Sequence, residues 1–163
     1  MADTKMHVLV CGGTGCLSSN SSDIVDNLIA EIKAAGMEDE VKVLKTGCFG
    51  FCEKGPIVKI LPDNTFYTQV KPEDAKEIVA EHIVKGRKVE RLLYMDPEKE
   101  QHISDAKHMD FYKKQMRVAL RNCGFIDPDN IEEYIGRDGY QALAERVGSR
   151  AEGLRFSVIG LDG

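Results

Sequence analysis

Two pairs of cysteines constrain this 163-residue chain more than any other feature. Cys11 and Cys16 bound the sequence CGGTGC, Cys48 and Cys52 bound CFGFC, and 31 residues separate the two pairs. Neither pair has the C-x-x-C spacing that disulfide oxidoreductases use. If all four thiols serve one site, the fold must bring two distant segments together.

The residues around these cysteines predict a strand–helix–strand unit. Residues 6–11 form a short apolar run that ends at Cys11, and residues 40–45 alternate as a second strand. Between them, residues 20–36 carry apolar side chains at helical spacing, with polar capping candidates from Asn20 and Gly36 at the end. Since parallel strands joined by a crossover end at one sheet edge, we expect Cys11 and Cys48 to meet there.

The next residues predict two more strands and a second helix. Residues 56–62 and 65–70 read as strands joined by a turn, and residues 71–86 read as a helix with Pro72 in its first turn and Gly86 at its end. The order βαβ-ββα over residues 1–86 predicts an α/β domain of the thioredoxin-like kind.

The rest of the chain has a weaker pattern. Residues 87–109 are charged, have little apolar periodicity and are interpreted as a connector. Residues 111–124 begin as a helix or strand and end at Gly124, and residues 127–146 predict one or two short helices that Asp127 or Asp129 caps. We therefore expect a mostly helical or extended C-terminal appendage.

Four converging thiolates suit several kinds of site. A [2Fe–2S] cluster needs two terminal ligands on each iron, which matches a two-plus-two grouping. Gly12, Gly13 and Gly15 allow close backbone approach, and Phe49 and Phe51 are candidates for shielding the cluster from water. Structural zinc, thiol–disulfide chemistry and simple burial of free cysteines remain alternatives. Cys123, the fifth cysteine, is interpreted as a buried thiol without ligand partners nearby.

Composition limits the other function classes. The formal net charge is −5 and no long basic run occurs, which argues against nucleic acid and anionic membranes as partners. The sequence shows no signal peptide and no membrane-spanning segment, so a cytoplasmic location is expected. Thiols stay reduced there, which favours metal binding over disulfides.

The spacing C-x4-C followed by C-x3-C on a βαβ frame resembles the thioredoxin-like [2Fe–2S] ferredoxins. It is also similar to the related cluster domains of complex I and of NAD(P)-linked hydrogenases and formate dehydrogenases. The resemblance implies that Cys11, Cys16, Cys48 and Cys52 are the cluster ligands. It also implies an electron carrier with no catalysis of its own.

A second resemblance covers part of the C-terminal half. Residues 120–124 (LRNCG), 126–128 (IDP) and 139–143 (GYQAL) look like the segment that opens the FMN- and NADH-binding flavoprotein subunit of the same complexes. The resemblance implies that the other subunits of a redox complex are the partners. A homodimer is a second arrangement that the sequence leaves open.

The flavoprotein likeness stops early. The glycine-rich flavin loop expected after this segment is not found, so FMN and NAD(P)H are expected in the full-length family and not in this chain. We accordingly divide the chain into a ferredoxin domain (1–86), a connector (87–109) and a truncated opening segment of the flavoprotein (110–163).

Overall fold

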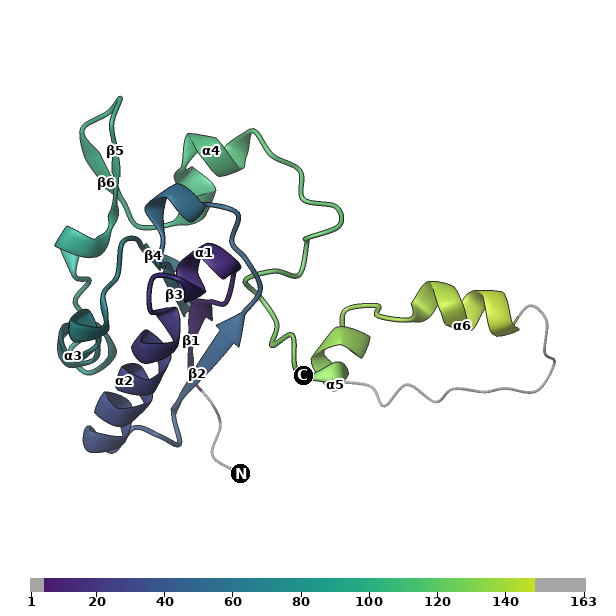
Figure 1. The fold of residues 1–163 in the computed structure, drawn as a ribbon, viewed down its shortest axis with the longest axis horizontal. Coiled ribbons are helices and arrows are strands. Elements are labelled where there is room, and N and C mark those ends of the chain that lie inside the picture. The colour runs from purple at the N-terminus through teal and green to yellow at the C-terminus, as the bar shows by residue number, and fades with distance from the viewer. Residues whose placement is uncertain (1–4, 149–163) are drawn as a thin grey trace.

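The computed structural model describes residues 5–148 and contains a four-stranded mixed sheet (Figure 1). Its strands, in the order β2-β1-β3-β4, are β2 (Val41–Thr46), β1 (Met6–Cys11), β3 (Val58–Leu61) and β4 (Thr65–Tyr67). β1 runs parallel to β2 and antiparallel to β3, and β4 completes a hairpin with β3. The predicted βαβ-ββα order is confirmed.

Two helical segments cover one face of the sheet. α2 (Ser21–Ala34) lies in the β1–β2 crossover, as predicted. The predicted helix at 71–86 consists of a 3-10 turn (Pro72–Asp74), α3 (Ala75–Glu77) and a π-helical stretch (Ile78–Ile83). Gly36 and Gly86 follow these helices with φ of +69° each, a conformation that glycine adopts without steric cost. The sequence did not predict the four-residue helix α1 (Thr14–Leu17), which contains Cys16.

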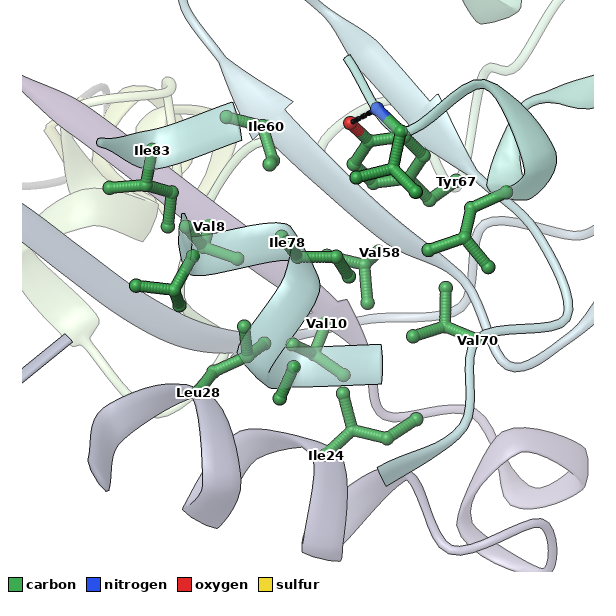
Figure 2. Close-up of a cluster of buried hydrophobic side chains, with 14 of the residues drawn as sticks. Val8, Val10, Ile24, Leu28, Val58, Ile60, Tyr67, Val70, Ile78 and Ile83 are labelled. Carbon is green, nitrogen blue, oxygen red and sulfur yellow. Dashed lines mark hydrogen bonds between the residues drawn. The ribbon is translucent and has the colours of Figure 1, made fainter. Parts of the chain in front are cut away.

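Alternate residues of the strands supply two separate apolar clusters, because successive side chains of a strand point to opposite faces. Figure 2 shows the first cluster, in which strand residues pack against the helices. Its labelled side chains are Val8, Val10, Ile24, Leu28, Val58, Ile60, Tyr67, Val70, Ile78 and Ile83.

The second cluster lies on the other face of the sheet and includes the first two cysteines. Leu9 of β1 and Phe66 of β4 pack there with residues that follow the strands. The remaining buried members are Cys11, Cys16, Leu44, Phe49, Phe51, Ile57 and Met109. Both faces of the sheet are therefore covered.

Residues 87–109, interpreted from the sequence as a connector, fold against the sheet. They form a 3-10 turn (Glu90–Leu92), a hairpin of β5 (Tyr94–Asp96) and β6 (Gln101–Ile103), and a second 3-10 turn (Ala106–His108). Backbone hydrogen bonds of 2.8 Å join Thr68 N to Leu92 O and Phe66 N to Ser104 O. The segment thus continues the hydrogen bonding of the β4 edge, which is an edge that would otherwise lie open.

The C-terminal part is helical or extended, as expected. It contains α4 (Asp110–Lys113), α5 (Ile131–Ile135) and α6 (Gln141–Gly148), and Figure 1 shows α5 and α6 away from the sheet. The predicted cap of α5 was wrong, because Asn130 accepts the hydrogen bonds from Glu132 N and Glu133 N. Among the described residues, no helix has the length and apolar character needed to cross a membrane.

Candidate functional site

The two cysteine-bearing loops meet at the sheet edge where β1 and β2 end. Cys11 is the last residue of β1 and pairs in register with Thr46, the last residue of β2. Cys16 lies in α1, Cys48 follows β2 by two residues, and Cys52 begins a 3-10 turn that ends at Lys54. The predicted convergence of the loops is confirmed, since it follows from the parallel pairing of their strands.

The second cysteine pair has the spacing of two ligands on one metal. The Sγ atoms of Cys48 and Cys52 are 3.9 Å apart. Two sulfurs bound to one tetrahedral metal at about 2.3 Å lie about 3.8 Å apart. Gly50, between them, has a φ of +81° and its backbone N–H donates to Cys48 Sγ at 3.3 Å. The turn therefore presents both sulfurs in one direction and supplies a donor to one of them.

Glycines allow the two loops to interlock. A Cβ at Gly13 would lie 3.0 Å from Cys48 Sγ and 3.5 Å from Cys11 Sγ. A Cβ at Gly55 would lie 2.8 Å from Cys16 Sγ. The first loop thus passes directly beside the Cys48 thiol. The chain that follows the second loop passes beside the Cys16 thiol.

The four thiols differ in exposure. Cys11 and Cys16 are 1% and 2% exposed, Cys48 is half-buried and Cys52 is exposed. A group held by all four would therefore be enclosed on the β1 side and close to solvent on the Cys48–Cys52 side.

This environment favours the protonated forms of Cys16 and Cys52. Burial, together with the hydrogen bond to Cys11 and its proximity, raises the pKa of Cys16 to about 12. The pKa of Cys52 is also raised, mainly by its hydrogen bond to Cys48. Thiolates gathered this closely require a positive partner, and binding of a metal centre would displace their protons.

Aromatic side chains form the floor of the site. Phe49 packs edge-to-face on Phe66 with ring centroids 5.5 Å apart, and Phe51 stacks on Phe111 at 4.7 Å. Phe49 and Phe51 are buried in the same cluster as Cys11 and Cys16. The prediction that they are placed to exclude water from the cysteines is consistent with this packing.

Residues from the C-terminal half hold the second loop in place, a role that the sequence did not indicate. Tyr112 Oη donates to Phe49 O at 3.0 Å, and Thr46 Oγ1 accepts from Gly124 N at 3.0 Å and donates to Ile126 O at 3.0 Å. These contacts span 63 to 80 residues of sequence, so no local pattern reveals them.

Cys123 lies closer to the site than expected. It is half-buried, and a Cβ at Gly47 would lie 2.9 Å from its Sγ. Gly47 directly precedes Cys48, so this thiol lies beside the second cysteine loop and is less buried than expected. Its exclusion from the ligand set remains a prediction.

The donor set fits a binuclear centre. Cys11 lies close enough to Cys16 to raise its pKa, and the Sγ atoms of Cys48 and Cys52 are 3.9 Å apart, so the thiols group in two pairs. Within residues 5–148, no group of three or more His, Cys, Asp or Glu is placed so that it could hold a metal ion as it stands. Two pairs are what two bridged irons require, because each iron takes two terminal thiolates.

A small thioredoxin-like domain with two cysteine pairs at the carboxyl edge of its parallel strands fits the class of iron–sulfur electron carriers. The comparison with known families agrees. Residues 2–82 match the family model "Thioredoxin-like [2Fe-2S] ferredoxin", and the chain belongs to that family. The family implies a [2Fe–2S] cluster as the cofactor.

Individual relatives support the assignment. The chain is 38% identical over 100 residues to "Ferredoxin, 2Fe-2S" of Clostridium pasteurianum, with 56% of this chain and 98% of the relative covered. The crystal structure of the wild-type thioredoxin-like [2Fe-2S] ferredoxin from Aquifex aeolicus superposes with a TM-score of 0.50 and 33% identity. The superposition covers 55% of this chain and 96% of the Aquifex ferredoxin.

A third similarity is short. The chain is 61% identical over 33 residues to "NADP-reducing hydrogenase subunit HndC" of Solidesulfovibrio fructosivorans. The match covers 20% of this chain and 7% of that subunit.

Proposed function

We propose that Cys11, Cys16, Cys48 and Cys52 hold the [2Fe–2S] cluster, and that the chain transfers electrons as a module of an NAD(P)-linked multisubunit oxidoreductase in the cytoplasm. The observation that carries the proposal is the convergence of two cysteine pairs at one sheet edge. The cluster, when bound, supplies one-electron chemistry.

Each part of the site has a separate task in this proposal. Cys11 and Cys16 anchor the enclosed side, and the aromatic floor of Phe49 and Phe51 limits water access. Cys48 and Cys52 lie nearer to solvent, so electrons enter and leave over this side, where a partner docks. The Gly50 N–H stabilises negative charge on the sulfur of Cys48.

The proposed complex is of the hydrogenase, formate dehydrogenase or NADH dehydrogenase type. Its support is the short similarity to a hydrogenase subunit and the resemblance of residues 120–143 to the opening of a flavoprotein subunit. Large apolar side chains are exposed along the C-terminal part, including Met116, Val118, Ile131 and Leu143, as expected of a segment that packs on another subunit. FMN and NAD(P)H bind to that partner in this proposal, and the chain itself is a carrier without catalysis.

Serine substitutions test the ligand set. We expect Cys11→Ser, Cys16→Ser, Cys48→Ser and Cys52→Ser to lose most of the visible sulfide-to-iron absorption after anaerobic reconstitution, since serine replaces a soft thiolate on an iron. Cys123→Ser is the matched control and should keep the wild-type spectrum. Equal absorption in all five variants would refute the assignment, and loss only in Cys123→Ser would place the ligands elsewhere.

An electron-transfer assay tests the proposed complex. The reconstituted chain is mixed with the purified NADP-reducing hydrogenase subunit HndC of Solidesulfovibrio fructosivorans, and NADPH is added. We expect cluster bleaching only when this subunit is present. Bleaching by NADPH alone would show that the chain is itself an enzyme. No bleaching with the subunit present would contradict the proposed partner class and leave the cluster assignment standing.

A further inference from the structure

A cavity of about 280 Å³ lies beside the second cysteine loop, between the sheet and the C-terminal segment. Its walls are largely aromatic: Phe49 from the loop, Phe66 from β4, Tyr112 and Phe125. Its volume is just below the range of about 300–1,000 Å³ typical of drug-sized ligands, so it suits a smaller molecule.

The charged residues around this cavity are mostly cationic. Lys59, Lys107, Lys113 and Arg117 line it, and Asp105 is the single acidic member of the lining. Asp105 already accepts hydrogen bonding from Lys107 N at 2.9 Å. A cationic cavity is unusual in a chain of net charge −5, and it attracts an anion locally.

Lys59 is the most informative of these residues. It lies on β3 opposite Phe66, on the apolar face of the sheet, and is 7% exposed. Its ammonium lies 4.3 Å from the centre of the Phe125 ring, and within residues 5–148 it makes no hydrogen bond or ion pair. Burial lowers its pKa, and the Asp105 carboxylate opposes this shift without forming an ion pair with Lys59. A bound anion in direct contact would offset more of the cost of burying this charge.

Arg117 extends the same arrangement. Its guanidinium lies 5.1 Å from the centre of the Tyr112 ring and donates to Cys123 O at 3.4 Å, which leaves further N–H groups for a ligand. Cations above aromatic walls, one of them on a largely buried lysine, are suited to a flat molecule that carries a negative group.

We propose that this cavity binds a small aromatic carboxylate, with the ring against Phe49 and Phe66 and the carboxylate between Lys59 and Arg117. The aromatic walls favour a free molecule of this kind over an aliphatic acidic side chain of a partner protein. The inference concerns a site separate from the four cysteines and does not depend on the identity of the redox partner.

Isothermal titration of the full chain with benzoate tests the proposal, with benzamide as the neutral molecule of the same shape and acetate as the mimic of an acidic side chain. We expect benzoate to bind at least tenfold more tightly than either. Equal affinity for benzamide would overturn the role of charge, equal affinity for acetate would overturn the role of the ring, and no heat with benzoate would overturn the site.

Two variants locate the binding. We expect Lys59→Met and Arg117→Gln each to weaken benzoate binding at least tenfold. Lys42→Met, which removes an exposed lysine of β2, is the matched control and should bind like the wild type. Methionine suits an apolar sheet face, so Lys59→Met is expected to fold, and Arg117→Gln gives an independent reading. Unchanged affinity in both variants would overturn the assignment.

Discussion

At the scale of single residues, the candidate site depends on how closely two backbones approach. Gly13 lies between the thiols of Cys11 and Cys48, and its φ is an ordinary negative value. The requirement for glycine there is therefore one of space and not of backbone conformation. Gly15, two residues later, has only an ordinary contact of 3.9 Å to Cys52 Cβ.

This difference gives a prediction. Gly13→Ala places a methyl group within 3.0 Å of Cys48 Sγ, so we expect it to reduce the cluster content after anaerobic reconstitution. The expected loss of unfolding free energy is about 1–3 kcal/mol, the usual cost of overpacking. Gly15→Ala is the control and should keep both the cluster and the stability, as measured by visible absorption and urea unfolding. Equal behaviour of the two variants would show that the loops adjust freely.

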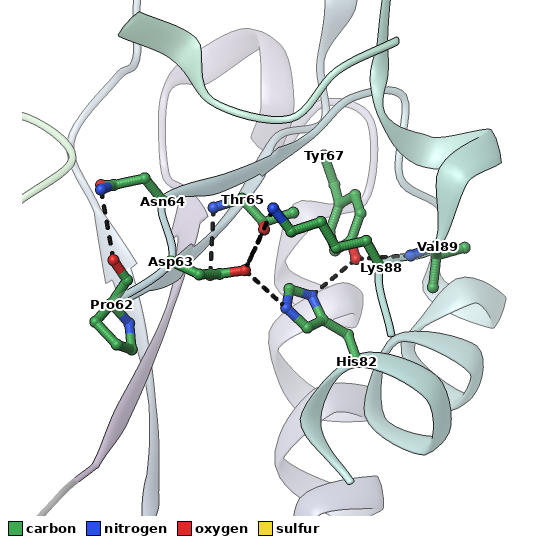
Figure 3. A network of polar contacts seen from close by, with 8 residues as sticks. All are labelled: Pro62, Asp63, Asn64, Thr65, Tyr67, His82, Lys88 and Val89. Carbon is green, nitrogen blue, oxygen red and sulfur yellow. Dashed lines mark hydrogen bonds and ion pairs between the residues drawn. The ribbon is translucent and has the colours of Figure 1, made fainter. Parts of the chain in front are cut away.

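At the scale of elements, a polar network fixes the second helical segment against the β3–β4 hairpin (Figure 3). Val89 N donates to Tyr67 Oη at 2.9 Å, so the Tyr67 hydroxyl proton is free to be donated to His82 Nδ1 at 2.8 Å. His82 Nε2 then donates to Asp63 Oδ2 at 3.1 Å. These hydrogen bonds require a neutral imidazole that carries its proton on Nε2. A second proton, on Nδ1, would point toward the hydroxyl proton that Tyr67 donates.

The network makes stability depend on pH. Burial lowers the pKa of His82 below its ordinary value of 6.5, despite the opposing effect of Asp63. As the pH falls, the imidazole of His82 therefore takes up a proton in the unfolded chain before it does so in the folded one. The contribution of neutral His82 to the unfolding free energy is complete above pH 6.5 and is lost below it.

Urea unfolding between pH 5 and about 7.5 measures this dependence. We expect His82→Gln to flatten the decline, because glutamine cannot titrate in this range. His108→Gln is the control, since His108 is exposed on a 3-10 turn. A decline of the same steepness in His82→Gln would assign the pH dependence to other groups.

At the scale of the whole molecule, residues 94–113 act as the cover of the second sheet face, whereas Val89 and Leu92 before them pack in the first cluster. Met109 is fully buried in the cluster that contains Leu9, Cys11 and Phe66, whereas Met116, seven residues later, is 89% exposed. The folded body therefore extends past the helix that ends before Gly86. The domain bounds drawn from the sequence remain a proposal for how the chain is organised.

We expect Met109→Ala to lower the unfolding free energy by about 2–5 kcal/mol, as other buried large-to-small changes do. Met116→Ala should change it by less than about 0.5 kcal/mol. Chemical unfolding followed by far-UV circular dichroism measures both. Similar, small effects of the two substitutions would mean that residues 94–113 do not contribute to the core.

The sequence predicted those parts of the molecule that depend on local patterns. The strands, α2 and the meeting of Cys11 with Cys48 follow from periodicity and from the parallel connection. Helix α1 was missed because four residues give no periodicity. The cover of the second face was missed because its apolar residues, such as Ile103 and Met109, are scattered among charged ones. The apolar residues on both faces of β1 were the available signal, since a strand buried on both sides needs two covers.

The central claim is that the four paired cysteines hold a binuclear iron–sulfur cluster. The most direct test is the iron, zinc and acid-labile sulfide content of the full chain, purified anaerobically. We expect two irons and two sulfides per chain, as the composition of a [2Fe–2S] cluster requires. One zinc per chain with no sulfide would contradict it and would favour a zinc-stabilised module at the same four cysteines.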